Sequence, residues 1–357
     1  MWRVAVMTFY EKRRGIYLIC AIGILAMVLL AVFSATLGAA DISFSGAWRV
    51  MAHRIPLLGN LIDIDDISKM HQTIILNLRI PRILLAIMVG GLLAGSGTVY
   101  QSVFRNPMAD PFVLGVSSGA ALGAAATMIF GLEMSLFGIS SISVAAFIGA
   151  LVTTFIVYRV SSSGGKTPVM TLILTGIAMS FFLSSILSLL ITFNRDQLEQ
   201  IVFWSYGSLS TTGWRHIYTV LPFYAVSMGF FLLKGRVLNI LTLGEESASS
   251  LGVDVQKERK ILLAVASLAT AAAVAVTGII GFVGLVVPHM LRLITGPDNR
   301  SLLPYTIIAG GIFMLVCDAV ARTAIIPMEI PIGIITSAIG APYFIYLIVR
   351  NKKRGLS

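Results

Sequence analysis

The sequence predicts an all-α, polytopic membrane protein, on three observations. Of the 357 residues, 57% are hydrophobic and only 12% are charged, whereas soluble domains average about 25% charged residues. Several uncharged stretches approach the length of about 20 residues that an α-helix needs to cross a bilayer. These apolar runs are continuous instead of alternating with polar residues, which excludes a transmembrane β-barrel.

We expect ten membrane-spanning helices in a single transmembrane domain that covers residues 1–357. The first apolar run, Gly15 to Ala40, is too long for the core of a signal peptide, so we interpret it as a retained span. The eighth is short for a full crossing, and we expect it to be tilted or partly re-entrant. The ten spans lie roughly at residues 15–38, 80–104, 113–131, 138–158, 168–193, 215–233, 260–279, 282–294, 304–322 and 332–350.

The basic residues predict the topology. Most of the 26 lysines and arginines fall on the inner side when both termini are placed inside, including the clusters at residues 12–14, 257–260 and 350–354. This agrees with the positive-inside rule. The net charge of +10 is spread among loop ends, so it does not indicate binding to nucleic acid.

The first long outer segment runs from Asp41 to Asn77 and contains His53 and His71 close to several aspartates. We favour a surface-lying amphipathic segment, and the alternative is a metal site formed by the two histidines and those aspartates. The two cysteines, Cys20 and Cys317, fall inside separate spans, so we expect neither a disulfide nor a metal site from them.

The longest polar interruption in the second half of the chain is Leu243–Val253. Gly244 can begin a short helix there, and Gly252 can end it in the left-handed cap conformation. Glu245 and Glu246 fall in its first turn, where the helix dipole favours acidic side chains. Topology places this helix on the inner side of the membrane.

Such a helix is too short to be stable alone. Ala248 and Leu251 are three residues apart and are therefore expected to share a face. We expect this face to receive a partner protein, with residues 237–256 forming the whole cytoplasmic segment.

A non-helical segment is predicted after the second span. Pro107 and Pro111 prevent continuation of the helix, and Asp110 is pushed to extended geometry by the proline that follows it. Non-helical backbone at the membrane edge must be buried in protein or line a wet cavity. The segment is therefore either part of a gate or an ordinary turn, and local physics supports both equally.

Two arginines flank Pro81 at the outer start of the second span. Arg79 and Arg82 share a similar face and oppose the helix dipole, so they either extend to lipid headgroups or bind an acidic partner. In the ninth span, Asp318 and Arg322 have the spacing of an ion pair within one helix.

Three classes of function are considered for a chain of this kind: a transport subunit powered by a separate ATPase, an ion-coupled secondary carrier and an intramembrane enzyme. An ion-coupled secondary carrier of a bulky solute would need a series of acidic residues within the spans, and an intramembrane enzyme would need a catalytic dyad or a metal cluster. The sequence contains neither. It also lacks a phosphate-binding loop, so any ATP hydrolysis must occur on another polypeptide, and the chain itself is not predicted to be an enzyme.

Six motifs together resemble one family, the permease subunits of type II ABC importers for iron–siderophore complexes, haem and cobalamin. The resemblance covers nearly the whole chain in order and spacing. The motifs are Arg79–Arg82 (RIPR), Gln101–Ala120 (QSVFRNPMADP followed by LGVSSGA), Gly244–Gly252 (GEESASSLG), Gly281–Arg292 (GFVGLVVPHMLR), Asp318–Arg322 and Glu329–Pro342 (EIPIGIITSAIGAP).

The resemblance implies ten helices per subunit and a dimer of permeases, most simply a homodimer. It also implies two cytoplasmic ATPase subunits and an extracytoplasmic substrate-binding protein, but no cofactor. The location implied is the cytoplasmic (inner) membrane of a bacterium or archaeon, with both termini in the cytoplasm. The cargo would be an iron chelate, with a ferric siderophore as the default and haem or cobalamin as alternatives.

The resemblance also implies three groups of site residues. The family's coupling helix, which contacts the ATPase, matches Gly244, Glu245, Glu246, Ala248, Leu251 and Gly252. The arginines that dock the binding protein match Arg79, Arg82 and Arg322. The gate matches Asn106 and Met108, and, by looser alignment, Val169 and Met170 before the fifth span.

Overall fold

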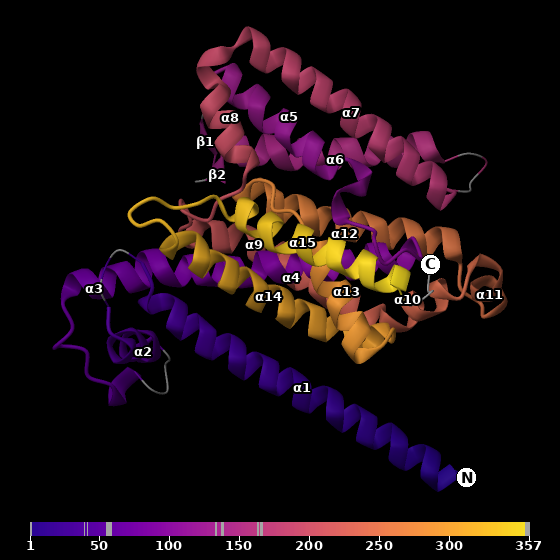
Figure 1. The fold of residues 1–357 in the computed structure, drawn as a ribbon, viewed down its shortest axis with the longest axis horizontal. Coiled ribbons are helices and arrows are strands. Elements are labelled where there is room, and N and C mark those ends of the chain that lie inside the picture. The colour runs from indigo at the N-terminus through magenta and orange to yellow at the C-terminus, as the bar shows by residue number, and fades with distance from the viewer. Residues whose placement is uncertain are drawn as a thin grey trace.

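The structure is a computed structural model that describes residues 2–38, 40, 42–54, 59–132, 134–136, 139–162, 164 and 167–353. Three residues that entered the predictions lie outside the described residues: Asp41, the start of the predicted outer segment, and Lys166 and Arg354, two basic residues placed on the inner side. Helices dominate the fold (Figure 1). In the described part of the chain the only sheet is a hairpin of β1 (Ser135–Leu136) and β2 (Ile139–Ser140), in which Ser135 pairs with Ser140.

Each of the ten predicted spans corresponds to a helix, and the bounds agree to within about five residues except for the first helix, which begins at Trp2 and not near Gly15. These helices are α1 (Trp2–Thr36), α4 (Ile80–Val103), α5 (Val116–Ile129), α6 (Ser141–Ser161), α7 (Val169–Phe193), α9 (Trp214–Leu233), α12 (Val255–Thr277), α13 (Val283–Thr295), α14 (Asn299–Thr323) and α15 (Ile332–Lys353). Seven apolar helical stretches in the described residues are long enough to cross a membrane, and the apolar parts of α5, α13 and α15 are shorter.

Shorter elements connect these helices. They are α2 (Phe44–His53), η1 (Gly59–Leu61), α3 (Lys69–Thr73), η2 (Ile74–Arg79), η3 (Pro111–Leu114), η4 (Arg195–Gln197), α8 (Leu198–Ser205), α10 (Gly235–Thr242) and α11 (Glu245–Ser250). The eighth span, α13, has 13 residues, which corresponds to a length of about 20 Å and not to the roughly 30 Å of a hydrocarbon core. The expectation of an incomplete crossing therefore agrees with its length.

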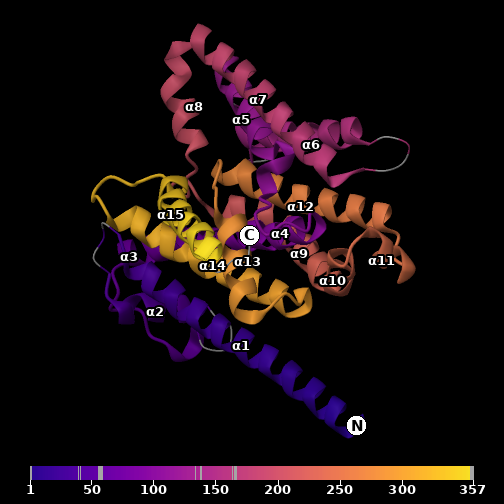
Figure 2. The same cartoon turned by 45° about the vertical axis from the view of Figure 1, so that its right-hand side comes forward.

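Helix α4 forms the centre of the molecule and is buried along almost its whole length. It packs against α9, α12, α13 and α14, while α5, α6, α7 and α8 form a second group to one side (Figures 1 and 2). Glycines permit the closest approaches: a Cβ on Gly90 would lie 2.1 Å from the carbonyl oxygen of Gly310, and one on Gly97 would lie 1.9 Å from that of Gly284.

The start of the second span differs from the prediction. Helix α4 does not begin at a free end, because α3, the π-helical stretch η2 and α4 are continuous from Lys69 to Val103. The backbone N–H of Ile80 donates to the carbonyl of Ile75, five residues earlier. The wider turn accommodates Pro81, which has no N–H to donate, so the helix continues through this residue.

The two ends of the molecule carry different elements. Helices α2 and α3 lie at one end, and α10 and α11 lie at the other (Figures 1 and 2). The N-terminal end of α1 and the C-terminal end of α15 both lie toward the end that carries α11. These two helix ends therefore lie at the same end of the molecule.

The outer segment contains the predicted amphipathic surface helix, α2. Gly46, Ala47 and Val50 face inward, while Trp48 is exposed. His53 Nδ1 lies 2.9 Å from the carbonyl oxygen of Ile62. Among the described residues no group of three or more His, Cys, Asp or Glu side chains is arranged to hold a metal ion.

Candidate functional site

The short helix predicted between two glycines is present as α11, and both of its ends are formed as expected. Gly244 precedes it at φ +108° and Gly252 follows it at φ +80°. The N–H of Val253 donates to the carbonyl of Ala248, and the N–H of Gly252 donates to that of Ser249, which together form a Schellman cap. Glu245 and Glu246 lie in the first turn.

The expectation that Ala248 and Leu251 share a face is wrong. Ala248 is completely buried, whereas Leu251 is 60% exposed. The reason is that the helix ends at Ser250 and Leu251 is the C-cap residue, so the helical spacing no longer applies to it. The surface that α11 offers to a partner therefore includes Leu251 and Glu246 but not Ala248.

A buried arginine that the sequence did not single out connects α11 to α7. The guanidinium of Arg259, in the second turn of α12, forms an ion pair with Glu245. It also donates a 2.7 Å hydrogen bond to the carbonyl of Thr167. The N–H of Thr167 donates to Gln256 Oε1 at 3.1 Å. Thr167 stands two residues before α7, so both of its backbone polar groups are held by α12.

Helix α7 begins with the two residues that were matched only loosely to a gate. Val169 is half-buried and Met170 is 67% exposed. The fixed position of Thr167 means that the start of α7 is connected through Arg259 to the first residue of α11.

The other predicted gate segment also contacts the beginning of α11. Arg105 follows α4 in a left-handed conformation at φ +49°. A Cβ on Gly244 would lie 3.3 Å from the Nη1 atom of Arg105. Beyond Arg105, the side-chain oxygen of Asn106 accepts a 2.9 Å hydrogen bond from the N–H of Met108, and Met108 is 48% exposed.

The predicted extended geometry at the end of this segment is present. Asp110 has φ −113° and ψ 146°, and its carboxylate accepts a hydrogen bond from the N–H of Phe112 at 2.8 Å, which caps η3. Arg105–Asp110 is therefore an ordered non-helical connection that lies close to α11.

Helix α10 is anchored to the start of α14. Asn239 Nδ2 donates to Asp298 Oδ1 at 2.7 Å, and Asn239 Oδ1 accepts from the N–H of Asn299 at 2.7 Å. Hydrogen bonds from Arg300 and then Asn239 hold the pKa of Asp298 well below its usual range. The predicted cytoplasmic segment is thus fixed at its first part by α14 and at α11 by Arg259.

At the opposite end of the molecule, all three predicted docking arginines are buried, and two of them bind backbone carbonyls. Arg79 donates to the carbonyls of Ala35 and Ala40. Arg322 donates to the carbonyls of Leu37 and Ser34 at 3.1 Å and to the Ser34 hydroxyl at 2.6 Å. Carbonyls at a helix C-terminus have no partner within their own helix, and the two arginines supply donors for those at the end of α1.

Arg82 forms two ion pairs. Its Nε lies 2.7 Å from Asp318 Oδ1, and its Nη1 lies 2.9 Å from Glu329. Asp318 is completely buried and also lies 3.0 Å from Arg322 Nε, so the predicted pair within α14 is present. The Glu329 side chain is 40% exposed, which makes it the member of this cluster that a partner can reach.

Sequence reasoning missed Arg259, Thr167 and Glu329 as site residues. Arg259 was visible only as one of several inner basic residues, and nothing local distinguishes it from its neighbours Lys257 and Lys260. Glu329 stands inside a quoted motif, but its partner Arg82 is 247 residues away.

Comparisons with known proteins agree with this architecture. Residues 25–350 match the family model of the FecCD transport family. The chain is 44% identical over 285 residues to the cobalamin import system permease protein of Halobacterium salinarum, which covers 80% of this chain and 76% of that protein. It is 39% identical over 334 residues to the hemin transport system permease protein of Yersinia pestis, which covers 93% of this chain and 95% of that one.

A solved structure of a metal-chelate type ABC transporter in an inward-facing conformation superimposes with a TM-score of 0.80. The two sequences are 33% identical, and the match covers 93% of this chain and 99% of the other. The likeness therefore extends over the whole helical architecture.

Proposed function

Because the chain belongs to the FecCD transport family, we propose that it is the permease subunit of a type II ABC importer that moves a chelated metal inward by alternating access. A ferric siderophore is the first cargo to test. Haem and cobalamin are the alternatives, since relatives are named for hemin and cobalamin import. The proposal rests on the family match, which covers residues 25–350. The capped helix α11 at one end of the molecule supports it.

Partners are assigned to three surfaces. Two ATPase subunits contact α11 on the cytoplasmic side. A substrate-binding protein docks at the opposite end, where Arg79, Arg82 and Arg322 lie. A second permease packs against α7, whose buried residues include only Leu172 and Gly176 among those that the structure describes. Large apolar side chains such as Phe181, 72% exposed, remain available on α7 for that interface.

The contacts of α11 supply a route for coupling. A displacement of α11 by the ATPases would act through Glu245 and Arg259 on Thr167, and so on the start of α7. It would act at the same time through Gly244 on Arg105, and so on the segment that contains Asn106 and Met108. Both gate segments would then respond to the same movement of α11. Such a response requires only that α11 makes different contacts in the outward-open and inward-open states.

Glu246 provides the first test, because its charge can be reversed without breaking an internal ion pair. Its exposed carboxylate has no ion-pair partner in the described part of the chain, whereas Glu245 pairs with Arg259. We expect Glu246→Lys to reduce ATP-dependent uptake about 5-fold to 150-fold, the range of ordinary coupling energies. The measurement is uptake into liposomes that contain permease, ATPase and binding protein.

The matched control is Glu199→Lys, which makes the same charge change at an exposed residue of α8. Unchanged uptake by Glu246→Lys would contradict the assignment of α11. Uptake by the permease alone, driven by an ion gradient, would instead identify an ion-coupled secondary carrier.

Arg259 provides the second test. Arg259→Ala breaks the connection from α11 to Thr167, so we expect the ATPase to hydrolyse ATP while uptake per ATP falls at least about 5-fold. Arg259→Lys should restore part of the coupling, because a lysine retains the charge but not the two-armed geometry. Lys257→Ala, at an exposed position two residues away, is the control, and equal uptake per ATP in all variants would contradict the route.

A further inference from the structure

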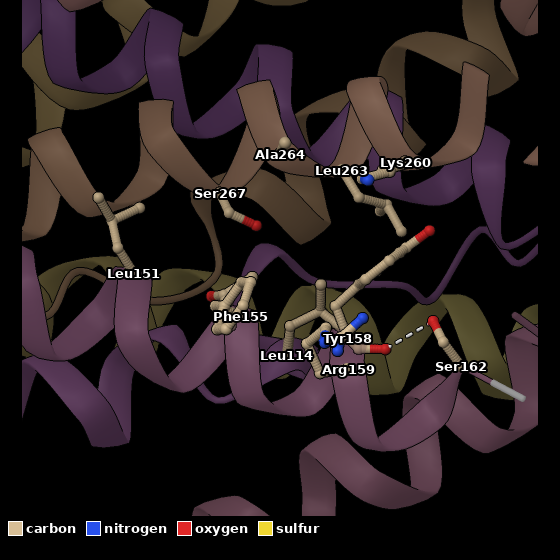
Figure 3. A pocket seen from close by; sticks show the side chains of 11 residues that line it. Leu114, Leu151, Phe155, Tyr158, Arg159, Ser162, Lys260, Leu263, Ala264 and Ser267 are labelled. Atoms are coloured by element: carbon tan, nitrogen blue, oxygen red, sulfur yellow. Dashed lines mark hydrogen bonds between the residues drawn. The ribbon is translucent and has the colours of Figure 1, made fainter. Parts of the chain in front are cut away.

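A cavity of about 390 Å³ lies between α6 and α12, and two of its lining residues, Tyr158 and Ser162, contact the side chain of Thr167. Figure 3 shows side chains of the two helices facing one another across it. Its volume falls in the range of roughly 300–1,000 Å³ that is typical of small-molecule sites. Its lining residues are Leu114, Leu151, Thr154, Phe155, Tyr158, Arg159, Ser162, Lys260, Leu263, Ala264 and Ser267.

The interior of the cavity is apolar. Its lining includes Leu114, Leu151, Phe155 and Leu263, and Phe155 is 64% exposed. The hydroxyl of Ser267 is already paired with Tyr100 at 2.7 Å. The interior therefore favours a hydrocarbon chain over a polar solute.

Two cations lie at one end of the cavity. Arg159 is in the last turn of α6, and Lys260 is in the second turn of α12. Both side chains are exposed, and neither forms an ion pair within the described ranges. The dipole of α6 accounts for a cation at its C-terminal end, but the dipole of α12 does not favour one near its N-terminal end.

This cationic end lies near α11. Arg259, the neighbour of Lys260, pairs with Glu245 of that helix. A second cavity of about 160 Å³ lies further along α6 and α12 toward the opposite end, where α9 also contributes, and includes Phe147, Phe223 and Ala272. Its lining contains no charged side chain. The charge is therefore confined to the membrane edge beside α11, where a lipid headgroup would lie.

We propose that the cavity between α6 and α12 binds an anionic phospholipid of the leaflet on the α11 side. The phosphate lies between Arg159 and Lys260, and one acyl chain occupies the apolar interior along Phe155 and Leu263. Basic pockets between membrane helices on the cytoplasmic side are suited to anionic headgroups. The site is separate from the transport function proposed above and does not depend on the identity of the cargo.

Native mass spectrometry of the purified chain tests the charge requirement. Phosphatidylglycerol should remain bound to the wild-type protein more strongly than phosphatidylcholine. Arg159→Ala combined with Lys260→Ala should weaken phosphatidylglycerol binding about 30-fold, from about a fivefold effect for each cation near a membrane surface. Arg236→Ala combined with Lys257→Ala is the control, because it removes two exposed cations at the same end that do not line the cavity.

Filling the cavity tests the acyl chain independently of charge. Ala264 is an exposed lining residue, so Ala264→Trp should reduce phosphatidylglycerol binding without unfolding the chain, which circular dichroism and gel filtration would verify. Equal binding of both lipids, unchanged binding by the double alanine variant, or unchanged binding by folded Ala264→Trp would each overturn the proposal. A loss of binding in the Arg236 and Lys257 control equal to that in the cavity variant would also overturn it.

Discussion

Single arginines connect separate helices at both ends of this molecule. Arg259 pairs with Glu245 of α11 and donates to the carbonyl of Thr167 before α7. Arg82 pairs with Asp318 of α14 and with Glu329 in the segment before α15. Guanidinium groups suit such positions because they present several donors in a fixed plane and remain charged when they are buried.

A prediction at Arg82 distinguishes two roles of this side chain: docking of the substrate-binding protein and ion pairing within the permease. If Arg82 binds an acidic side chain of the binding protein, Glu329 competes for it. Glu329→Gln should then strengthen binding of that protein about fivefold, the effect of one surface ion pair of ~1 kcal/mol. Surface plasmon resonance with the permease in nanodiscs measures it, and Glu199→Gln is the matched control.

A further variant, Arg82→Ala, tests the contribution of this arginine to stability. Arg82→Ala leaves the buried Asp318 with one partner fewer and should lower the free energy of unfolding by about 1–3 kcal/mol, measured by thermal unfolding in detergent.

In the binding experiment, the contradicting outcome is that Glu329→Gln weakens binding of the substrate-binding protein. Glu329 itself would then be the docking residue, and the assignment to Arg82 would be wrong.

At the scale of elements, the packing of α4 depends on residues that lack a side chain. Gly90 of α4 lies against Gly310 of α14, and Gly97 of α4 lies against Gly284 of α13. Small residues allow helix backbones in a membrane to approach closely.

Gly97→Ala should therefore destabilise the chain. The new Cβ would lie 1.9 Å from a backbone oxygen, so the helices must separate, at a cost of about 1–3 kcal/mol. Gly229→Ala in α9 is the matched control because its Cβ would have no neighbour within 4 Å, and it should be neutral or stabilising by up to ~1 kcal/mol. Thermal unfolding in detergent measures both, and equal midpoints would contradict the contact.

At the scale of the whole molecule, the ends of the helical bundle differ in their surface structures. One end carries α2, the β-hairpin and the segment with Glu329, and the other carries α10, α11, the N-terminal end of α1 and the C-terminal end of α15 (Figure 1). An ABC importer requires two different end surfaces, because its binding protein and its ATPases contact opposite sides of the membrane.

The orientation can be tested with single cysteines. After Cys20→Ser and Cys317→Ser, Asp65→Cys at the α2 end should react with a membrane-impermeant maleimide in intact cells. Glu246→Cys should react only after the membrane is permeabilised. Both positions are exposed in the structure, so accessibility does not bias the comparison, and labelling of Glu246→Cys in intact cells would contradict the proposed topology.

The sequence alone determined the class of protein, the ten spans and the position of α11. Each of these depends on local properties: the length of an apolar run, the ability of Gly244 to begin a helix and of Gly252 to end one in the left-handed cap conformation, and the placement of acidic residues in a first turn. Such signals are contained within a few turns of helix and need no distant partner.

The tertiary structure alone decided what the charged side chains contact. Arg82 meets Asp318 and Glu329 across 236 and 247 residues of chain, Arg79 and Arg322 meet the end of α1, and Arg259 connects α11 with α7. It also brought Arg159 and Lys260 to one cavity. No local pattern encodes these contacts, because the free energy of a buried charge depends on which groups folding brings beside it.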